Sequence, residues 1–145
     1  MFFLYQILIS IIILLSPIII LIRILKNKED IKRFKEKFCL FSKKKVAGKL
    51  IWFHGASVGE LLSVVPLIEK LEKEKDIKNI LLTTSTLSSS NLFKKFKFKK
   101  TFHKFYPIDN YFIVNRFLNY WKPSAVFFVE SEIWPEMLKI LKLRK

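Results

Sequence analysis

The sequence predicts an α/β fold, in which helices cover a parallel sheet that follows an apolar amino-terminal helix. Short apolar runs alternate with helix-like stretches four times after residue 49, and such alternation is typical of a right-handed parallel sheet. The first 22 residues carry no charged side chain. As a helix they would be about 33 Å long, enough for a hydrocarbon core of about 30 Å.

We expect the apolar segment, residues 1–25, to be an uncleaved membrane anchor that spans the bilayer or lies in its interface. A cleaved signal peptide would need a positive start and a small-residue cleavage site, and the sequence shows neither. Residues 23–37 hold seven basic and three acidic side chains. The positive-inside rule therefore places this basic juxtamembrane segment, residues 26–48, and a domain at residues 49–145 in the cytoplasm.

The formal net charge of +15 favours a polyanionic partner or an anionic membrane surface. Because an anchor adjoins the basic segment, we expect anionic lipids as a partner and no nucleic acid; each basic residue near such a surface contributes about 1 kcal/mol. The single Cys39 excludes an internal disulfide and a cysteine-rich zinc site. The two histidines, His54 and His103, lie far apart in sequence, and we expect no metal centre.

The domain begins with a predicted strand at about residues 50–54. Apolar residues at helical spacing predict a helix at residues 59–73, which Pro66 should bend or interrupt. A second strand is predicted at residues 80–84, followed by a polar turn at residues 85–90.

A short helix is expected at residues 91–98, and a weak third strand at residues 103–106. The next helix is predicted over residues 110–121, where the apolar residues again have helical spacing. Asp109 precedes this helix and is a candidate cap for it.

The fourth predicted strand, residues 125–129, is apolar at every position, which is typical of a strand buried on both faces. A last helix restarts at Ile133, with Pro135 tolerated in its first turn. We find no internal repeat and no long linker. Because a doubly wound sheet often has more strands, we expect this chain to be part of something larger.

Two glutamates are candidates for chemistry. Glu60 follows the first strand and Glu130 ends the fourth, so both belong to the carboxyl edge of the sheet, where ligands bind in open α/β folds. A carboxylate at that edge can accept a proton from a substrate hydroxyl. The alternative for Glu60 is a structural role in the first turn of its helix.

The segment Gly55–Gly59 also has the spacing Gly-x-Ser-x-Gly of a serine hydrolase. Such an enzyme needs a histidine and an acid, and His103 and Asp109 are in the wrong order for that fold. The turn also follows the first strand, so no earlier strand loop can help to form an oxyanion hole. A hydrolase that uses Ser57 as its nucleophile is therefore the weaker alternative.

Taken together, these motifs resemble one family, the bacterial transferases that attach 3-deoxy-D-manno-octulosonic acid (Kdo) to lipid A precursor. The resemblance covers essentially the whole chain, and five motifs in order behind an anchor are specific where one would not be. The motifs are Trp52–Glu60, Thr83–Thr86, Pro107–Asp109, Asn115–Leu118 and Glu130–Pro135.

The resemblance implies the Rossmann-like amino-terminal half of a GT-B glycosyltransferase, which binds the acceptor. The reaction implied is inverting transfer of Kdo from CMP-Kdo to lipid A precursor (lipid IVA) in lipopolysaccharide core biosynthesis, without a cofactor or a metal. Glu60 matches the general base, and Glu130 matches a carboxylate that supports the transition state. The implied substrate-binding residues are Ser57, Gly59, Thr84, Thr86 and Glu132.

The resemblance also places the protein at the bacterial inner membrane, with its catalytic domain on the cytoplasmic side. The lysine-rich stretch at residues 94–100, with Phe96 and Phe98, is expected to touch the phosphorylated acceptor surface. Some positions depart from the family pattern: Glu136 stands where an asparagine is usual, and Cys39 roughly where a glycine is common.

The half that binds CMP-Kdo has no counterpart in these 145 residues. We therefore expect this chain to be inactive by itself, and either to belong to a longer product or to pair with a separate donor-domain chain. The alternative is a non-catalytic, membrane-anchored lipid-binding remnant.

Overall fold

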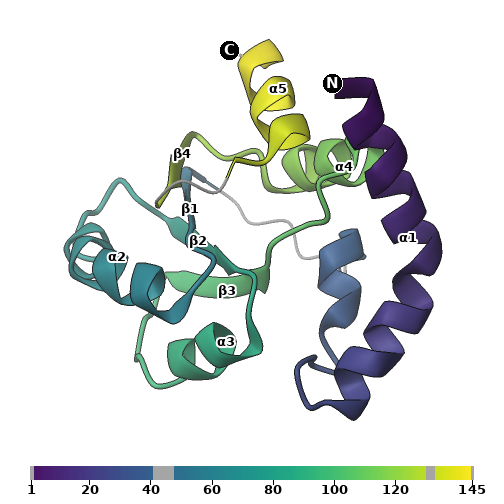
Figure 1. The fold of residues 1–145 in the computed structure, drawn as a ribbon. Helices are drawn as coiled ribbons and strands as arrows, with labels where there is room; N and C mark the ends of the chain where they lie inside the picture. Colours follow the sequence, from purple (N-terminus) through teal and green to yellow (C-terminus); the bar gives the residue numbers. More distant parts are fainter. Residues whose placement is uncertain (1, 41–47, 130–132, 145) are drawn as a thin grey trace.

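A computed structural model describes residues 2–40, 48–129 and 133–144 of the chain. Its centre is a four-stranded parallel sheet with the strand order β3-β2-β1-β4 (Figure 1). The predicted α/β class with a parallel sheet is therefore confirmed. The strands are β1 (Leu50–His54), β2 (Asn79–Thr84), β3 (Thr101–Phe105) and β4 (Ala125–Phe128).

Helices cover both faces of this sheet. The α2 and α3 helices pack on one face, and α4 and α5 pack on the other, while α1 runs along one side of the domain (Figure 1). The helices are α1 (Phe2–Leu25), α2 (Val58–Leu71), α3 (Leu87–Phe93), α4 (Tyr111–Trp121), α5 (Pro135–Leu143) and the short 3-10 helix η1 (Phe34–Phe38).

The two central strands supply side chains to a separate apolar core on each face. On β1, Trp52 packs against α4 and α5, whereas its neighbour Phe53 packs against α2. On β2, Leu81 and Leu82 divide in the same way. Successive side chains of a strand point to opposite faces, so strands covered on both sides must be apolar at nearly every position.

The α3 helix contradicts the expectation for this segment. The expected short helix is present but occupies residues 87–93 and not 91–98, and the polar turn predicted at residues 85–90 is wrong beyond residue 86. The cause is Thr86, whose hydroxyl accepts a hydrogen bond from the Ser89 backbone at 3.2 Å and starts the helix. Serines usually favour turns, but here a capped first turn holds them in a helix.

The β4 strand is not buried on both faces, and that prediction is wrong. Among the described residues β4 pairs with β1 and lies at an edge of the sheet. The side chain of Phe127 is 48% exposed. An apolar run shows that a strand is suited to burial, but its place in the strand order depends on contacts between distant segments.

The other helices begin close to the predicted positions. Asn110 caps α4 by accepting a hydrogen bond from the Phe112 backbone at 3.0 Å. The α2 helix is continuous through Pro66. Because proline has no N–H, the carbonyl of Leu62 loses its partner in the helix, and both residues lie on the exposed side of α2, where water can reach that carbonyl.

The described part of the basic segment is joined to the domain by a buried carboxylate. Glu36 of η1 accepts hydrogen bonds from Arg33 at 2.9 Å, from Lys104 at 2.9 Å and from the Phe105 backbone at 3.1 Å. Arg33 also donates to the hydroxyl of Ser90 at 2.9 Å. These contacts attach η1 to β3 and α3.

We predict that Glu36→Gln lowers the free energy of unfolding by about 1–3 kcal/mol at pH 7, because it leaves charged donors without their anion. Burial by itself would raise the pKa of Glu36, but hydrogen bonds from Arg33 and Lys104 outweigh it and lower the pKa. A lowered carboxyl pKa stabilises the fold above the unfolded value, and that stabilisation is lost as the pH falls.

Urea unfolding of the whole chain in detergent micelles, at pH 7 and at pH values below about 4, measures this difference. The difference in the free energy of unfolding between the parent chain and Glu36→Gln should be smaller at the lower pH. Glu69→Gln is the matched control, because Glu69 is exposed on α2. A gap that stays constant with pH would contradict the assigned role of Glu36.

Candidate functional site

The turn after β1 holds Glu60 by three hydrogen bonds. Ser57 caps α2, and its hydroxyl accepts from the Glu60 backbone at 3.3 Å and donates to Glu60 Oε1 at 2.9 Å. The backbone N–H of Ala56 donates to Glu60 Oε2 at 2.6 Å. Glu60 therefore has the structural role considered as its alternative. Each carboxylate oxygen can accept a further hydrogen bond, so this role leaves capacity for chemistry.

Two glycines shape the space around Glu60. A Cβ at Gly55 would lie 3.1 Å from Glu60 Cβ and 3.4 Å from its carbonyl carbon, so a side chain there would push Glu60 away. A Cβ at Gly59 would meet open space, with Ser57 Oγ the nearest atom at 4.0 Å. Gly55 thus permits the close approach of β1 to α2, and Gly59 leaves room beside Ser57.

The turn after β2 lies next to this one. The Gly55 backbone donates to the carbonyl of Thr83 at 3.1 Å, and the Ser85 backbone donates to the carbonyl of Ala56 at 3.3 Å. The structure therefore brings together two of the segments predicted to form the site, residues 57–60 and 84–86. Both lie at the carboxyl edge of the sheet, as expected.

The two threonines of the second turn already have partners within the protein. The hydroxyl of Thr84 is fully buried and lies 2.8 Å from Nε2 of His103. The hydroxyl of Thr86 caps α3 and lies 2.6 Å from Ser89 Oγ. Contact of either threonine with substrate stays a prediction.

His103 belongs to a buried polar network and not to a catalytic triad. Its Nδ1 lies 2.9 Å from a nitrogen of Arg33, and its other nitrogen faces Thr84. Burial, together with the nearby cations Arg33 and Lys104, lowers the pKa of His103 to about 3. Among the described residues, the side-chain hydrogen bonds of Ser57 go to Glu60. Ser57 therefore lacks the base that a serine nucleophile requires.

His54 is a site residue to which the sequence interpretation gave no role. It ends β1 and is buried, and its ring stacks on Tyr106 with 3.9 Å between the centroids. Its Nδ1 lies 3.1 Å from the carbonyl of Thr83, which can only accept, so Nδ1 carries the proton and Nε2 is an acceptor. The signal was present, since His54 lies within the motif that contains Glu60.

Glu130 and Glu132, which were predicted as site residues, lie outside the residues that the structure describes. The preceding residue, Val129, donates to the carbonyl of His54 at 2.8 Å, which places the end of β4 beside the end of β1. The supporting role of Glu130 and the substrate contact of Glu132 stay predictions.

The sequence suggested that Asp109 caps the helix that follows it, and this prediction is wrong. Asn110 caps α4, and Asp109 caps α5, accepting from the backbones of Glu136 at 2.9 Å and Met137 at 2.8 Å. Asp109 is 2% exposed. Its partner helix begins 26 residues later, so this cap is a tertiary contact and local spacing could not reveal it.

Among the described residues, no three histidine, cysteine, aspartate or glutamate side chains are grouped to hold a metal ion. The expectation of a reaction without metal or cofactor stays a prediction.

Comparison with known proteins places this arrangement in a family. Residues 32–145 match the family model described as 3-deoxy-D-manno-octulosonic-acid transferase (kdotransferase). The chain belongs to the Kdo transferase family. This match spans the turn with Glu60, the turn with Thr86 and the described part of the basic segment after Ile31.

Individual relatives agree with the family match. The Kdo transferase of Rickettsia bellii is 41% identical over 125 residues, which cover 84% of this chain and 30% of that protein. The Kdo transferase of Aquifex aeolicus is 36% identical over 117 residues, covering 81% of this chain and 31% of that protein. The chain thus spans about a third of the length of these relatives.

We predict that His54 stays neutral down to about pH 4, because burial lowers its pKa to about 4. In the unfolded chain His54 binds a proton nearer pH 6.5. Between about pH 6.5 and pH 4 the unfolded state therefore holds more protons than the folded state, and the free energy of unfolding falls as the pH drops through this range. NMR of the imidazole ring reports the titration directly. His54→Gln should lose less stability than the parent chain between pH 7 and pH 5, and equal losses would contradict this prediction.

Proposed function

We propose that this chain is the acceptor-binding part of a Kdo transferase at the cytoplasmic face of a bacterial inner membrane. The reaction is the transfer of Kdo from CMP-Kdo to lipid A precursor, and a further domain or a separate chain supplies most of the CMP-Kdo site. One observation carries the proposal. In a chain of this family, Glu60 lies at the carboxyl edge of the sheet beside the open space at Gly59.

In the proposed reaction, Glu60 acts as the general base. Its carboxylate takes the proton from an acceptor sugar hydroxyl, the hydroxyl oxygen attacks the anomeric carbon of Kdo, and CMP leaves from the opposite side with inversion. The Ser57 hydroxyl and the Ala56 N–H hold the carboxylate in one orientation. Glu130 is the proposed support for the charge that develops in the transition state.

The proposed acceptor contacts are Ser57, Gly59, Thr84, Thr86 and Glu132. Lys94, Lys95, Lys97 and Lys99 are exposed after α3. The Lys99 backbone donates to Glu72 at the carboxyl end of α2, so these lysines lie at the opposite end of α2 from Glu60 and suit the phosphates of the acceptor-bearing membrane surface and not the reacting hydroxyl. Phe96 and Phe98 lie between these lysines but stack on each other, with 5.4 Å between ring centroids, and pack against the core. The lysines and not the phenylalanines are therefore the proposed contact with the acceptor.

One observation favours the second candidate, a non-catalytic lipid-binding remnant. Both oxygens of Glu60 accept hydrogen bonds from its own turn, and a remnant would keep this cap without any chemistry. The two candidates differ in whether transfer appears when a CMP-Kdo-binding domain is supplied.

We predict that Glu60→Gln reduces Kdo transfer by about 10²- to 10⁴-fold, the usual contribution of a general base, when the chain is joined to a CMP-Kdo-binding domain from a relative. Glutamine keeps the size of the side chain and an oxygen acceptor for the Ala56 N–H, so binding of lipid A precursor should change less than about threefold. Transfer is measured with radiolabelled CMP-Kdo and acceptor binding by co-sedimentation with acceptor vesicles.

Glu69→Gln is the control, because it makes the same change at an exposed position of the same helix. It should leave both readouts unchanged. If Glu60→Gln keeps most of the transfer activity, Glu60 is not the base. If the joined protein with Glu60 intact shows no transfer while it still binds acceptor, the remnant is the better account.

A further inference from the structure

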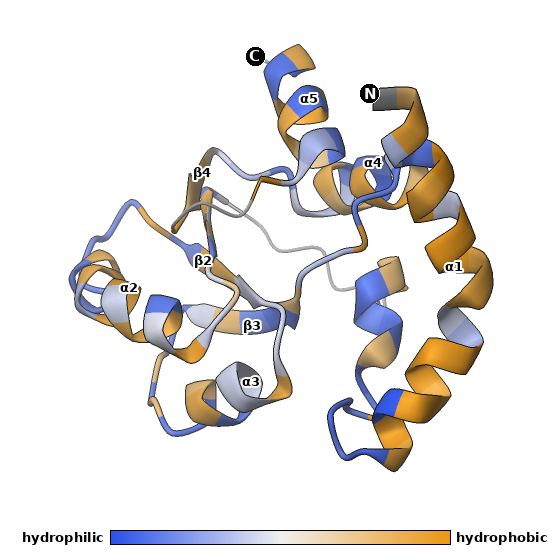
Figure 2. Cartoon of the chain, viewed as in Figure 1, coloured by the Kyte–Doolittle hydropathy of each residue, from blue (hydrophilic) through white to orange (hydrophobic). Residues whose placement is uncertain are grey.

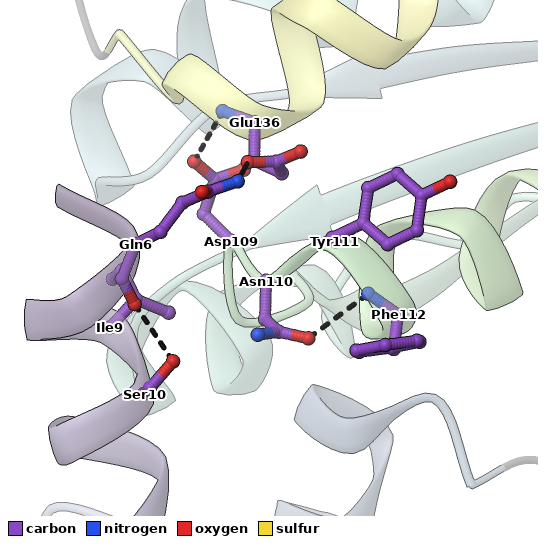
Figure 3. Close-up of a pocket in the computed structure, with 8 residues that line it drawn as sticks. All are labelled: Gln6, Ile9, Ser10, Asp109, Asn110, Tyr111, Phe112 and Glu136. Carbon is purple, nitrogen blue, oxygen red and sulfur yellow. Dashed lines mark hydrogen bonds between the residues drawn. The ribbon is translucent and has the colours of Figure 1, made fainter. Parts of the chain in front are cut away.

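The α1 helix bonds to the domain near its amino end. The hydroxyl of Tyr5 donates to Asp109 Oδ2 at 2.6 Å. The amide of the next residue, Gln6, donates to Glu136 Oε2 at 3.1 Å, and Figure 3 shows Gln6 beside Asp109 and Glu136. Both acceptors are buried in the domain, with Glu136 only 1% exposed. These are contacts between residues more than 100 positions apart in sequence.

The other end of α1 is joined to the domain as well. Arg23 donates to Glu29 at 2.8 Å, and Lys37 donates to the same buried carboxylate at 2.7 Å. Lys37 belongs to η1, which Arg33 and Glu36 attach to β3 and α3. One folded domain therefore holds both ends of the helix.

The separation of these two attachments matters for the membrane. Tyr5 and Arg23 are 18 residues apart, about 27 Å along a helix, which is close to the thickness of a hydrocarbon core. If α1 crossed the bilayer, Tyr5 would lie at the interface opposite Arg23. Asp109 is part of the domain that follows the basic segment, so it could not reach Tyr5 there.

The α1 helix also has two different faces along its length. The less exposed face carries Tyr5, Ile9, Ile13, Ser16 and Ile20, spaced three or four residues apart as on one side of a helix. The opposite face consists mainly of exposed apolar residues, and α1 is mostly hydrophobic in colour in Figure 2. By length and composition α1 is the one helix in the described residues that could cross a membrane.

The start of α4 lies beside the amino-terminal half of α1. Tyr111 and Phe112 line a cavity of about 290 Å³ together with Ile9 and Ser10 of α1 (Figure 3). The side chain of Phe112 is 76% exposed. Tyrosine and tryptophan are enriched at the level of the lipid headgroups, so the place of Tyr111 beside α1 fits a surface that faces a membrane interface.

We propose that α1 lies in the plane of one leaflet of an anionic bilayer, with its exposed apolar face in the lipid and both of its ends on the cytoplasmic side. Charge supports this partner: Lys26, Lys28, Lys32 and Lys35 are exposed just after the helix and can contact anionic headgroups. The proposal rests on the membrane attachment proposed above and is independent of the transfer reaction.

The sidedness of the amino terminus tests the proposal. A Gly-Ser-Gly-Cys extension is added before residue 1, and the whole chain is expressed in bacteria. A membrane-impermeant maleimide is then applied to inverted inner-membrane vesicles and to right-side-out spheroplasts. Cys39 stays in place, because it is buried and burial raises the pKa of its thiol to about 12, which keeps it unreactive in the folded chain.

We expect the added cysteine to react at least tenfold more in inverted vesicles than in spheroplasts, as should Lys78→Cys, an exposed position of the domain. Stronger reaction in spheroplasts would show that α1 spans the bilayer and would overturn the proposal. Recovery of the chain only in the fraction without membranes would instead overturn the membrane attachment itself. Neither result depends on Kdo transfer.

A second variant tests whether the two polar contacts hold α1 in the plane. Tyr5→Phe combined with Gln6→Leu removes both donors and makes the helix more apolar. We expect labelling of the added cysteine from the spheroplast side to rise at least threefold. Asn119→Leu is the matched control, because it makes a polar-to-apolar change like Gln6→Leu at an exposed position of α4, and it should leave sidedness unchanged. Unchanged sidedness in the double variant would show that these contacts do not orient α1.

Discussion

The buried carboxylate of Asp109 connects three parts of the chain that are distant in sequence. It lies just after β3, accepts two backbone hydrogen bonds at the start of α5, and accepts a third from Tyr5 of α1. A buried carboxylate is costly unless its oxygens are paired, so the three donors and the carboxylate depend on one another. Asp109 therefore fixes both the position at which α5 begins and the direction in which α1 runs along the domain.

Glu60 shows how a structural contact can also serve chemistry. The cap at the start of α2 fixes both oxygens of the carboxylate, and a base is most effective when its orientation is set before the substrate arrives. Gly55 and Gly59 have opposite roles around it: one lets the backbone approach, and the other leaves space. The capping role and the proposed role as base are therefore compatible.

The sequence was most informative where structure is local. The strand at residues 50–54, the turn that follows it and the helix with Glu60 could all be recognised, because their apolar spacing is set within a few positions. The edge position of β4 and the cap that Asp109 gives to α5 could not, since both depend on which distant segments meet. The α3 helix was placed four residues too late because one threonine cap outweighed the turn preference of three serines.

Position 39 adds a physical reason for one departure from the family pattern. Cys39 has φ 56° and ψ 34°, in the left-handed region where a side chain costs roughly 1–2 kcal/mol and glycine does not. Its thiol is buried in the core that contains Trp52, so packing of the side chain offsets the backbone strain. A glycine would avoid the strain and lose that packing, which explains how either residue can occupy the end of η1.

The orientation of α1 depends on the few polar side chains that it carries. Its length and apolar composition suit a helix that crosses a bilayer equally well as one that lies on it, so hydropathy cannot distinguish the two. The hydroxyl of Tyr5 and the amide of Gln6 can, because each needs a hydrogen-bond partner when it is removed from water. Asp109 and Glu136 provide those partners on the domain itself, and an amino end bonded there stays on the side of the membrane where the domain lies.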